Sequence, residues 1–456
     1  MIQTLSNFAQ ACGGRLQGAD RHYVGVVTDT RTLSAGELFV ALRGPNFNGN
    51  DFVAAAHAAG AAGAVVDAPQ ATPLAQVIVA DSQAALARAA QHWRGRFDIP
   101  VIAVAGSNGK TSTKEMLAAI LGEAGPCLAT RGNLNNHIGV PLTLLRLAPE
   151  HRFAGIEMGA HQSGDVAGLV ELATPSIGLI TNAGAEHLEG FGSLEGAARA
   201  EGEVIEGLPA TGTAVINADD PYDSLWRGLT RAQVSSFGMS PRASWHALDV
   251  HFDVDDEGFN THFTLVCPLG RVPLLLKLAG RHNVMNALAA AAAAAAAGAT
   301  LEHISAGLAR VRAVPGRLQF KRTAGGAWLI DDSYNANPSS VRAGIEVLAQ
   351  LDGRKWLVLG DMAELGDFAQ ASHAEVGAFA RAQGIERLYA TGALTVDSVE
   401  SFGAGGQWFA DPQALAAALI ANADPGVRML VKGSRVNRLE RVVAALIASP
   451  AGQGAQ

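Results

Sequence analysis

A glycine-rich loop carries the clearest chemistry in this sequence. It consists of Gly106, Ser107, Asn108, Gly109, Lys110 and Thr111, with Ser112 following. Glycines let backbone N–H groups approach phosphate oxygens, and a helix beginning near Thr111 would direct its positive end at them. Lys110 would add a charge between the terminal phosphates, and Thr111 a hydroxyl ligand for Mg²⁺. The loop predicts binding of a nucleoside triphosphate, although it is two residues shorter than the usual phosphate loop.

The segments on either side of the loop decide between this prediction and its alternative, a glycine turn with an exposed lysine. Residues 99–105 form an apolar run without alternation, which is typical of a strand buried on both faces of a parallel sheet. Residues 113–121 have the composition of a helix. Because a buried strand enters the loop and a helix leaves it, we favour phosphate binding.

Strand and helix patterns alternate along most of the 456 residues, which predicts an α/β protein of three domains. We expect a small N-terminal α/β domain over 1–81, a central phosphate-loop domain with a doubly wound, mostly parallel sheet over 82–314, and a Rossmann-like α/β domain over 315–456. Residues 245–276 are rich in β-formers and predict antiparallel strands. The alanine run 289–297 predicts a buried helix, and it is too short to span a membrane.

Composition excludes some classes of function. The net charge is -8, from 34 basic and 42 acidic residues, so we expect no nucleic-acid partner. Three cysteines without metal-binding spacing and an N-terminus without a signal-peptide pattern favour a reducing compartment, and hence the cytoplasm. We expect no membrane span and a monomeric protein.

The loop, extended through Ser112, resembles that of the Mur ligase family, which also includes folylpolyglutamate synthases. Further segments resemble the family in the same order along essentially the whole chain: 131–136, 139–141, 156–159, 181–184, 187–192, 280–283, 315–317 and 331–338. The resemblance implies an ATP-dependent amide ligase, which uses Mg²⁺ and forms an acyl phosphate before an amine attacks.

Within the family, three segments are most similar to the members that add D-alanyl-D-alanine to UDP-N-acetylmuramoyl-tripeptide in peptidoglycan synthesis. These segments are 133–136, 332–338 and 359–366. The resemblance then implies that 1–81 binds the UDP substrate, 82–314 binds ATP, and 315–456 binds the amine. Two alternatives stay open: a folylpolyglutamate synthase, which the separate N-terminal domain disfavours, and a nucleotide-switched binding protein that is not an enzyme.

The resemblance also implies a catalytic and metal-binding group around Lys110, formed by Glu157, His187 and Glu201. Glu157 ends a predicted strand, and its alternative is a surface acid. His187 matches a ligand of a second Mg²⁺. Most relatives have a carbamylated lysine where this sequence has Glu201, so our hypothesis is that the Glu201 carboxylate takes over its role. The alternative for Glu201 is an exposed helix residue.

Three further residues match positions that contact the nucleotide in the family. Asn283 matches the adenine contact, with a helix N-cap as its alternative. Arg317 matches a residue that reaches the nucleotide from beyond a hinge at 314–317, with a solvated linker charge as its alternative. Asp332 matches a carboxylate that contacts the ribose or the phosphates. Because Arg317 and Asp332 belong to the third domain, nucleotide binding should favour domain closure.

Candidate substrate-binding residues lie in all three domains. Thr30 and Arg31 resemble residues that hold the uridine diphosphate, although they are also consistent with an ordinary turn. Asn135 and Asn136 belong to the segment after the first central helix. On the third domain, the amine-binding candidates are Asn335, Asn337 and Lys432.

Overall fold

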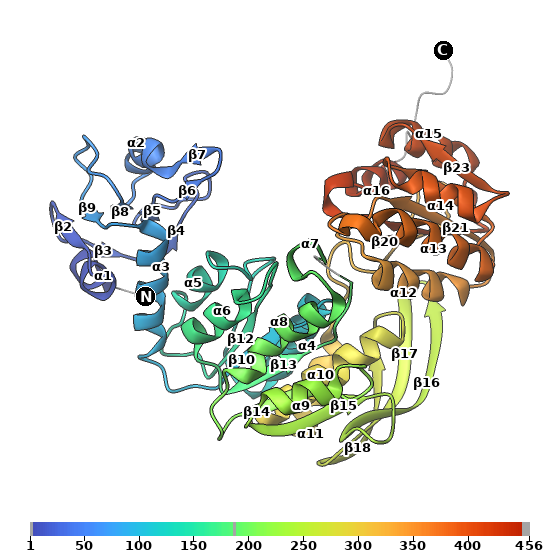
Figure 1. The fold of residues 1–456 in the computed structure, drawn as a ribbon, viewed down its shortest axis with the longest axis horizontal. Coiled ribbons are helices and arrows are strands. Elements are labelled where there is room, and N and C mark those ends of the chain that lie inside the picture. Colours follow the sequence, from blue (N-terminus) through green and yellow to red (C-terminus); the bar gives the residue numbers. More distant parts are fainter. Residues whose placement is uncertain (1–2, 186–187, 449–456) are drawn as a thin grey trace.

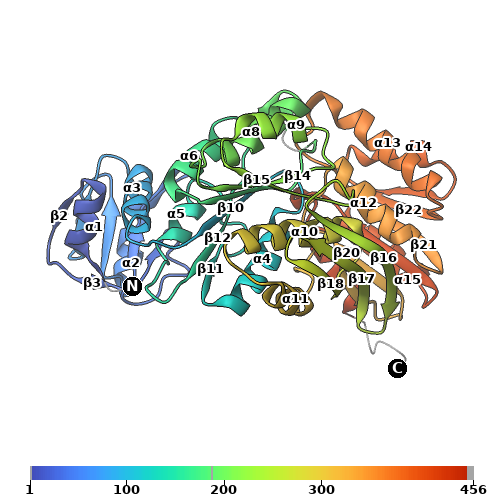
Figure 2. The same ribbon diagram turned by 90° about the horizontal axis from the view of Figure 1, so that it is seen from below.

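The computed structural model describes residues 3–185 and 188–448, which form three α/β units arranged in a row (Figures 1 and 2). Each unit has its own main sheet, of five, nine and six strands in chain order. The predicted α/β class with a largely parallel central sheet is confirmed. Among the described helices, none is both long and apolar enough to cross a membrane.

The first unit contains a mixed sheet with the strand order β2-β9-β8-β5-β4, in which only β2 runs antiparallel to its neighbour. Its elements are β1 (Gln3–Thr4), α1 (Leu5–Cys12), β2 (Arg15–Gln17), β3 (His22–Tyr23), β4 (Val26–Val27), β5 (Leu38–Val40), β6 (Arg43–Gly44), β7 (Phe47–Asn48), η1 (Gly49–Phe52), α2 (Val53–Ala58), β8 (Gly63–Val66) and β9 (Gln76–Ile78). Helix α3 (Ser82–Arg94) connects this unit to the next.

Residues 23–28 have a strand-like composition, but they do not form a single strand. The segment divides into β3, which pairs with β1, and β4, which pairs with β5 in the main sheet. Between them Val24 is 60% exposed. The segment is therefore interrupted at Val24, whose side chain is not part of the core.

The central unit contains the nine-stranded sheet, in the order β11-β12-β10-β13-β14-β15-β16-β17-β18. Its strands are β10 (Val101–Ala105), β11 (Cys127–Ala129), β12 (Phe153–Glu157), β13 (Ile177–Ile180), β14 (Thr213–Asn217), β15 (Gln233–Gly238), β16 (Trp245–Asp255), β17 (Gly258–Cys267) and β18 (Gly270–Leu276). Its helices are α4 (Lys110–Ala124), α5 (Gly139–Leu144), α6 (Asp165–Ala173), α7 (Leu188–Phe191), α8 (Leu194–Glu206), α9 (Asp223–Leu229), α10 (Arg281–Ala296) and α11 (Leu301–Arg310). The strands from β11 to β16 are parallel, and β16, β17 and β18 are antiparallel as predicted for residues 245–276.

Strand β10 lies inside the parallel part, between β12 and β13, and is buried on both faces. Val101, Ala103 and Ala105 pack into the core beneath α3, α6 and α8, whereas Ile102 and Val104 pack into the core beneath α4 and α10. This explains why residues 101–105 are apolar without alternation. The predicted buried alanine helix is also confirmed, since α10 packs against β13 to β16 on one side and α4 on another.

The third unit contains the six-stranded sheet, in the order β19-β20-β24-β21-β22-β23, with only β19 antiparallel to its neighbour. Its elements are β19 (Gln319–Arg322), β20 (Trp328–Asp332), α12 (Pro338–Ala349), β21 (Arg354–Gly360), η2 (Gly366–Phe368), α13 (Ala369–Ala382), β22 (Arg387–Thr391), α14 (Thr395–Phe402), β23 (Gly406–Phe409), α15 (Pro412–Asn422), β24 (Val427–Lys432), η3 (Arg435–Asn437) and α16 (Glu440–Ile447).

The third unit docks on the central one through contacts that include the following two. The long β16–β17 hairpin reaches it, and the rings of Phe259 on β17 and Phe320 on β19 meet edge to face with centroids 5.9 Å apart. The start of α12 meets the loop between β10 and α4. The chain crosses between the units at residues 311–318, which form neither helix nor strand. The second contact brings the third unit directly to the predicted phosphate loop.

Candidate active site

The predicted phosphate loop connects β10 to α4, as the sequence indicated. Gly106 and Gly109 have φ values of 121° and 83°, which side chains rarely adopt. A Cβ atom would also collide with Thr181 at the first position and with Asn286 at the second. Glycine is therefore required at both ends of the loop, and the loop lies close against the end of β13 and against α10.

The loop backbone is held by the segment that follows β13. Ser107 N donates to Asn182 O at 2.9 Å, and Asn108 N donates to Asn182 Oδ1 at 3.0 Å. Thr181 Oγ1 donates to Asn108 O at 2.7 Å. Lys110 Nζ lies over the loop and donates to Gly106 O at 2.6 Å. The loop is thus already shaped as a cradle at the positive end of α4, where phosphate would bind.

Glu157 ends β12 and is only 2% exposed, so the alternative of a surface acid is wrong. Its Oε1 accepts hydrogen bonds from Thr111 Oγ1 at 3.2 Å and from Asn135 Nδ2 at 2.8 Å. Its Oε2 is buried and has no hydrogen-bond partner among the described residues. A buried carboxylate oxygen without a partner is costly, so this position favours a bound cation.

Glu201 lies on α8 and is 2% exposed, so the alternative of an exposed helix residue is also wrong. Its Oε2 accepts a hydrogen bond from Gly106 N at 2.6 Å. The Glu201 carboxylate therefore touches the first residue of the phosphate loop. His187 lies outside the described residues. Within 3–185 and 188–448, no three His, Cys, Asp or Glu side chains gather as a metal-binding group.

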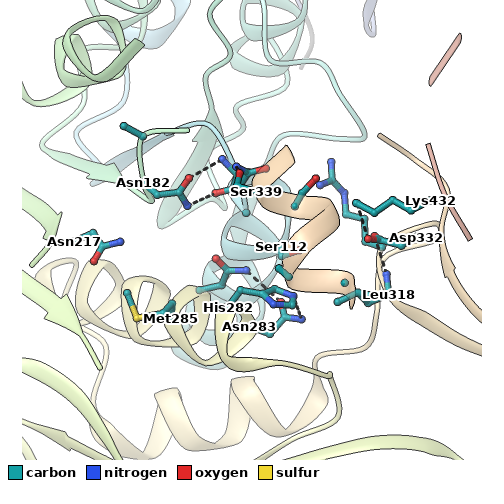
Figure 3. Close-up of a pocket in the computed structure, with 18 residues that line it drawn as sticks. Ser112, Asn182, Asn217, His282, Asn283, Met285, Leu318, Asp332, Ser339 and Lys432 are labelled. Carbon is teal, nitrogen blue, oxygen red and sulfur yellow. Dashed lines mark hydrogen bonds and ion pairs between the residues drawn. The ribbon is translucent and has the colours of Figure 1, made fainter. Parts of the chain in front are cut away.

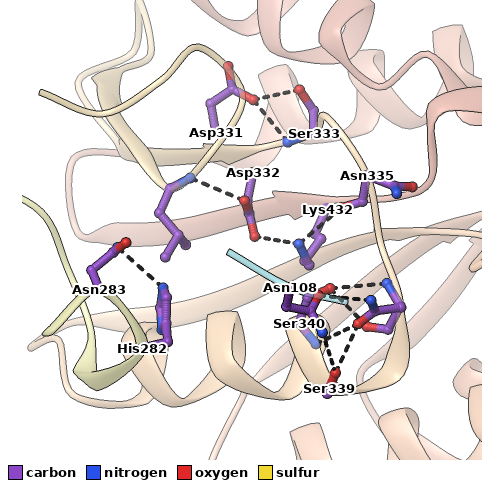
Figure 4. A network of polar contacts seen from close by, with 12 residues as sticks. Asn108, His282, Asn283, Asp331, Asp332, Ser333, Asn335, Ser339, Ser340 and Lys432 are labelled. Atoms are coloured by element: carbon purple, nitrogen blue, oxygen red, sulfur yellow. Dashed lines mark hydrogen bonds and ion pairs between the residues drawn. The ribbon is translucent and has the colours of Figure 1, made fainter. Parts of the chain in front are cut away.

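Two residues of the third unit, Arg317 and Asp332, complete the surroundings of the loop, and Figure 4 shows Asp332 beside Lys432. Arg317 Nη2 donates to Thr111 Oγ1 at 3.0 Å, and its guanidinium lies 4.5 Å from the centroid of the Tyr334 ring. The alternative of a solvated linker charge is therefore wrong for Arg317. Asp332 accepts from Lys432 Nζ at 2.6 Å and from Leu318 N at 3.1 Å. Burial raises the pKa of Asp332, and the charge of Lys432 opposes this rise.

A cavity of about 350 Å³ lies between α10 and α12, beside the loop (Figure 3). Its polar lining includes Asn182, Asn217, His282, Asn283, Asn286, Asp332 and Lys432. The N-cap of α10 is Gly280, so the N-cap alternative for Asn283 is wrong. Asn283 instead donates to Ala279 O at 2.8 Å and accepts from Asn286 Nδ2 at 3.2 Å. Burial, followed by the charge of Lys432, lowers the pKa of His282 to about 4, so this ring is neutral at pH 7.

A second cavity, of about 340 Å³, lies on the other side of the loop. It collects many of the predicted site residues: Ser107, Asn108, Gly109, Lys110, Thr111, Asn135, Asn136, Glu157, Arg317, Asp332, Asn335, Asn337 and Lys432. Asn108, Gly109, Arg317, Asp332, Ser340 and Lys432 line both cavities. The two cavities therefore meet at the phosphate loop, with one suited to a nucleoside and the other to phosphates and reacting groups.

The remaining predicted residues are placed differently. Thr30 and Arg31 follow β4 in the first unit and line neither cavity; the Arg31 side chain is 87% exposed and pairs with Asp29 at 2.6 Å. Asn136 Oδ1 accepts from Ile138 N and Gly139 N, so Asn136 also shapes the start of α5.

Sequence reasoning assigned no role to Asn182 or Asn286. A usable signal existed for Asn286, because it lies three residues after Asn283 on one face of α10. Asn182 follows β13 just as Glu157 ends β12, and ligands of open α/β sheets bind at such strand ends.

Fold and site together are those of an enzyme that binds a nucleoside triphosphate between a phosphate-loop unit and a third α/β unit. Three family models match the chain: "Mur ligase family, catalytic domain" over 22–104, "Mur ligase middle domain" over 104–294, and "Mur ligase, glutamate ligase domain" over 316–435. The chain is 45% identical to the UDP-N-acetylmuramoyl-tripeptide--D-alanyl-D-alanine ligase of Escherichia coli (strain K12), over 97% of this chain and 98% of that protein.

Solved structures agree with the sequence match. MurF from Acinetobacter baumannii superimposes with a TM-score of 0.91 at 34% identity, covering 98% of this chain and 99% of that one. MurF ligase from Thermotoga maritima in complex with ADP gives 0.81 at 26% identity, covering 92% and 96%. The chain belongs to the Mur ligase family. It is accordingly a ligase that uses ATP.

Proposed function

We propose that this chain joins D-alanyl-D-alanine to UDP-N-acetylmuramoyl-tripeptide, with release of ADP and phosphate, in the synthesis of peptidoglycan precursors. The names of its relatives, similar over nearly the full length of both chains, support these two substrates. The observation that carries the chemistry is the meeting of the two cavities at the phosphate loop. A nucleotide in the first cavity would present its terminal phosphate to a carboxylate in the second.

Activation must precede amide formation because oxide is a very poor leaving group from a carboxylate. The carboxylate of the tripeptide attacks the γ-phosphorus of ATP, and the bond to the β-phosphate oxygen breaks with ADP leaving. The amine of D-alanyl-D-alanine then attacks the acyl phosphate, and phosphate leaves while the amine loses a proton. Lys110 and the N–H groups of the loop at the start of α4 are suited to neutralise the charge on the transferred phosphoryl group.

The residues around Glu157 fit Mg²⁺. The available ligands there are a buried carboxylate with one unpartnered oxygen and the hydroxyl of Thr111, and Mg²⁺ prefers oxygen ligands. We propose that Glu157 and Thr111 hold the ion, which would neutralise the phosphates of ATP. Arg317, which donates to Thr111 Oγ1, would then contact the same phosphates from the third unit.

The role of Glu201 follows from its contact with Gly106. We propose that its carboxylate fixes the start of the loop and adds negative charge near the metal, in place of the modified lysine of most relatives. His187 would serve a second Mg²⁺. Asp332, held by Lys432 and by Leu318 N, would accept from the ribose hydroxyls, and Asn283 would contact the adenine.

The substrates would approach the second cavity from opposite ends. Thr30 and Arg31 belong to the first unit and would hold the UDP group, with the peptide extending toward Asn135 and Asn136. Asn335, Asn337 and Lys432 come from the third unit and line the same cavity, which supports them as contacts of the dipeptide. The 1–81, 82–314 and 315–456 segments would thus supply one substrate site each.

The test is ATP-dependent phosphate release by the purified chain. We expect release to require both D-alanyl-D-alanine and a UDP-N-acetylmuramoyl-tripeptide, and we would compare tripeptides ending in each common diamino acid. Release with glutamate and a folate instead would support the folylpolyglutamate synthase alternative. ATP binding without release under any substrate pair would support the nucleotide-switched binding protein.

A further inference from the structure

The side chain of Asn108 connects the phosphate loop to the third unit. Asn108 Nδ2 donates to Ser339 Oγ at 3.0 Å, and Asn108 Oδ1 accepts from Asn337 Nδ2 at 2.8 Å (Figure 4). Ser339 Oγ in turn donates to Asn337 Oδ1 at 3.1 Å. Among themselves, the three side chains each donate one hydrogen bond and accept one, so they form a closed ring of three hydrogen bonds.

The ring is not needed to shape the loop. The backbone of Asn108 is already fixed within the central unit, because its carbonyl accepts from Thr181 Oγ1 and Asn182 Nδ2 and its N–H donates to Asn182 Oδ1. With the backbone held from three sides, the amide group of Asn108 projects from a fixed point. Its hydrogen bonds therefore depend on where the third unit lies.

The partners of Asn108 are equally well fixed on their side. Asn337 is the N-cap of α12, and its Oδ1 accepts from Ser340 N at 2.9 Å, which leaves its Nδ2 for Asn108. The ring thus joins a fixed point on the loop to a fixed point at the start of a 12-residue helix. Asn108 lines both cavities, Ser339 lines the first and Asn337 lines the second, so the ring lies where the cavities meet.

We propose that Asn108 is a positioning residue, which docks the start of α12 on the phosphate loop and so aligns the third unit with the phosphates of ATP. The inference rests on the proposed function. When the ring forms, Lys432 and Asn335 border the same cavity as Glu157 and Lys110. The amine held by the third unit would then meet the acyl phosphate that forms beside the loop.

A double-mutant cycle tests the ring, with Asn108→Ala, Ser339→Ala and both together. In the wild-type background we expect Ser339→Ala to lower kcat/KM for D-alanyl-D-alanine by about three- to tenfold, the effect of losing one hydrogen bond or two. In the Asn108→Ala background the same change should have almost no effect. Ser401→Ala is the matched control, because Ser401 is an exposed serine on α14 of the same unit.

Equal losses from Ser339→Ala in both backgrounds would overturn the proposal, as would full activity of Asn108→Ala. A second measurement does not depend on the reaction. With ADP bound and no other substrate, the radius of gyration from small-angle X-ray scattering should be larger for Asn108→Ala than for the wild type. Equal values would overturn the proposal, whereas a wild type that is inactive with D-alanyl-D-alanine would contradict only the proposed function.

Discussion

Glu157 brings a negative charge beside the loop that we propose holds the phosphates of ATP. Its Oε2 is buried without a partner among the described residues, so the charge opposes folding until a cation binds. Glu157→Gln keeps the shape and removes the charge. We expect the variant to unfold at a higher temperature without ligands, and to lose about 100-fold or more in kcat because the metal is no longer held.

The two halves of this prediction are measured separately, by thermal unfolding and by phosphate release. Glu150→Gln serves as the control, since Glu150 is an exposed carboxylate of the same unit. An active Glu157→Gln variant with an unchanged Mg²⁺ requirement would contradict the assignment of Glu157 to the metal.

Two variants of Glu201 are needed, because its carboxylate supplies both a hydrogen-bond acceptor for Gly106 N and a negative charge. Glu201→Ala removes both, and we expect at least about a tenfold loss of kcat, as for a charged hydrogen bond, with a higher Mg²⁺ requirement. Glu201→Gln keeps an acceptor for Gly106 N, so it should retain more activity than Glu201→Ala while still needing more Mg²⁺.

Glu206→Ala, an exposed change on the same helix, is the control for both Glu201 variants. Full activity of Glu201→Ala at limiting Mg²⁺ would contradict the hypothesis. Position 201 offers no amine for carbamylation, so bicarbonate should leave the wild-type activity unchanged.

Much of the site was predictable because residue type alone limits what each side chain can do. The pattern of Gly106, Lys110 and Thr111 predicts phosphate binding. A carboxylate at a strand end, such as Glu157, predicts a cation ligand. The amides were harder to predict. Asn108 and Asn337 are 229 positions apart, and only the docking of two units makes them partners.

The alanine-rich composition of helix α10 indicates that the helix packs tightly against its neighbours. Its alanines pack between the sheet and α4, where Ala291 has no exposed surface. Larger side chains would force the two layers apart. We expect Ala291→Leu to lower the free energy of unfolding by about 1–3 kcal/mol, the usual cost of overpacking a tight core. Denaturant titration measures the change.

Ala296→Leu is the matched control, because Ala296 is exposed near the end of the same helix. Equal effects of the two substitutions would show that α10 does not depend on small side chains.

Burial on both sides could be predicted for α10 and β10 because their apolar runs are uninterrupted. The break between β3 and β4 could not, since their pairing with different sheets depends on distant strands.

Nucleotide binding should couple the central and third units, because residues of both line the cavities beside the loop. In the proposed function Arg317 would be the direct link to the phosphates, because it donates a hydrogen bond to Thr111 Oγ1 beside the loop. Any ligand that binds only the folded form raises the unfolding temperature, and more so when it binds more tightly. We therefore expect ADP with Mg²⁺ to raise the midpoint of thermal unfolding clearly less in Arg317→Ala than in the wild type.

Arg322→Ala is the comparison that makes this prediction specific. Arg322 also bridges the two units, through a 2.7 Å ion pair with Asp256, but the two side chains are 44% and 98% exposed and line neither cavity. Exposed pairs of this kind contribute little, typically below about 1 kcal/mol. The ADP-induced rise should stay at the wild-type value in Arg322→Ala. If the ADP-induced rise is reduced equally in Arg317→Ala and Arg322→Ala, general weakening of the interface explains the effect, and Arg317 has no special role at the phosphates.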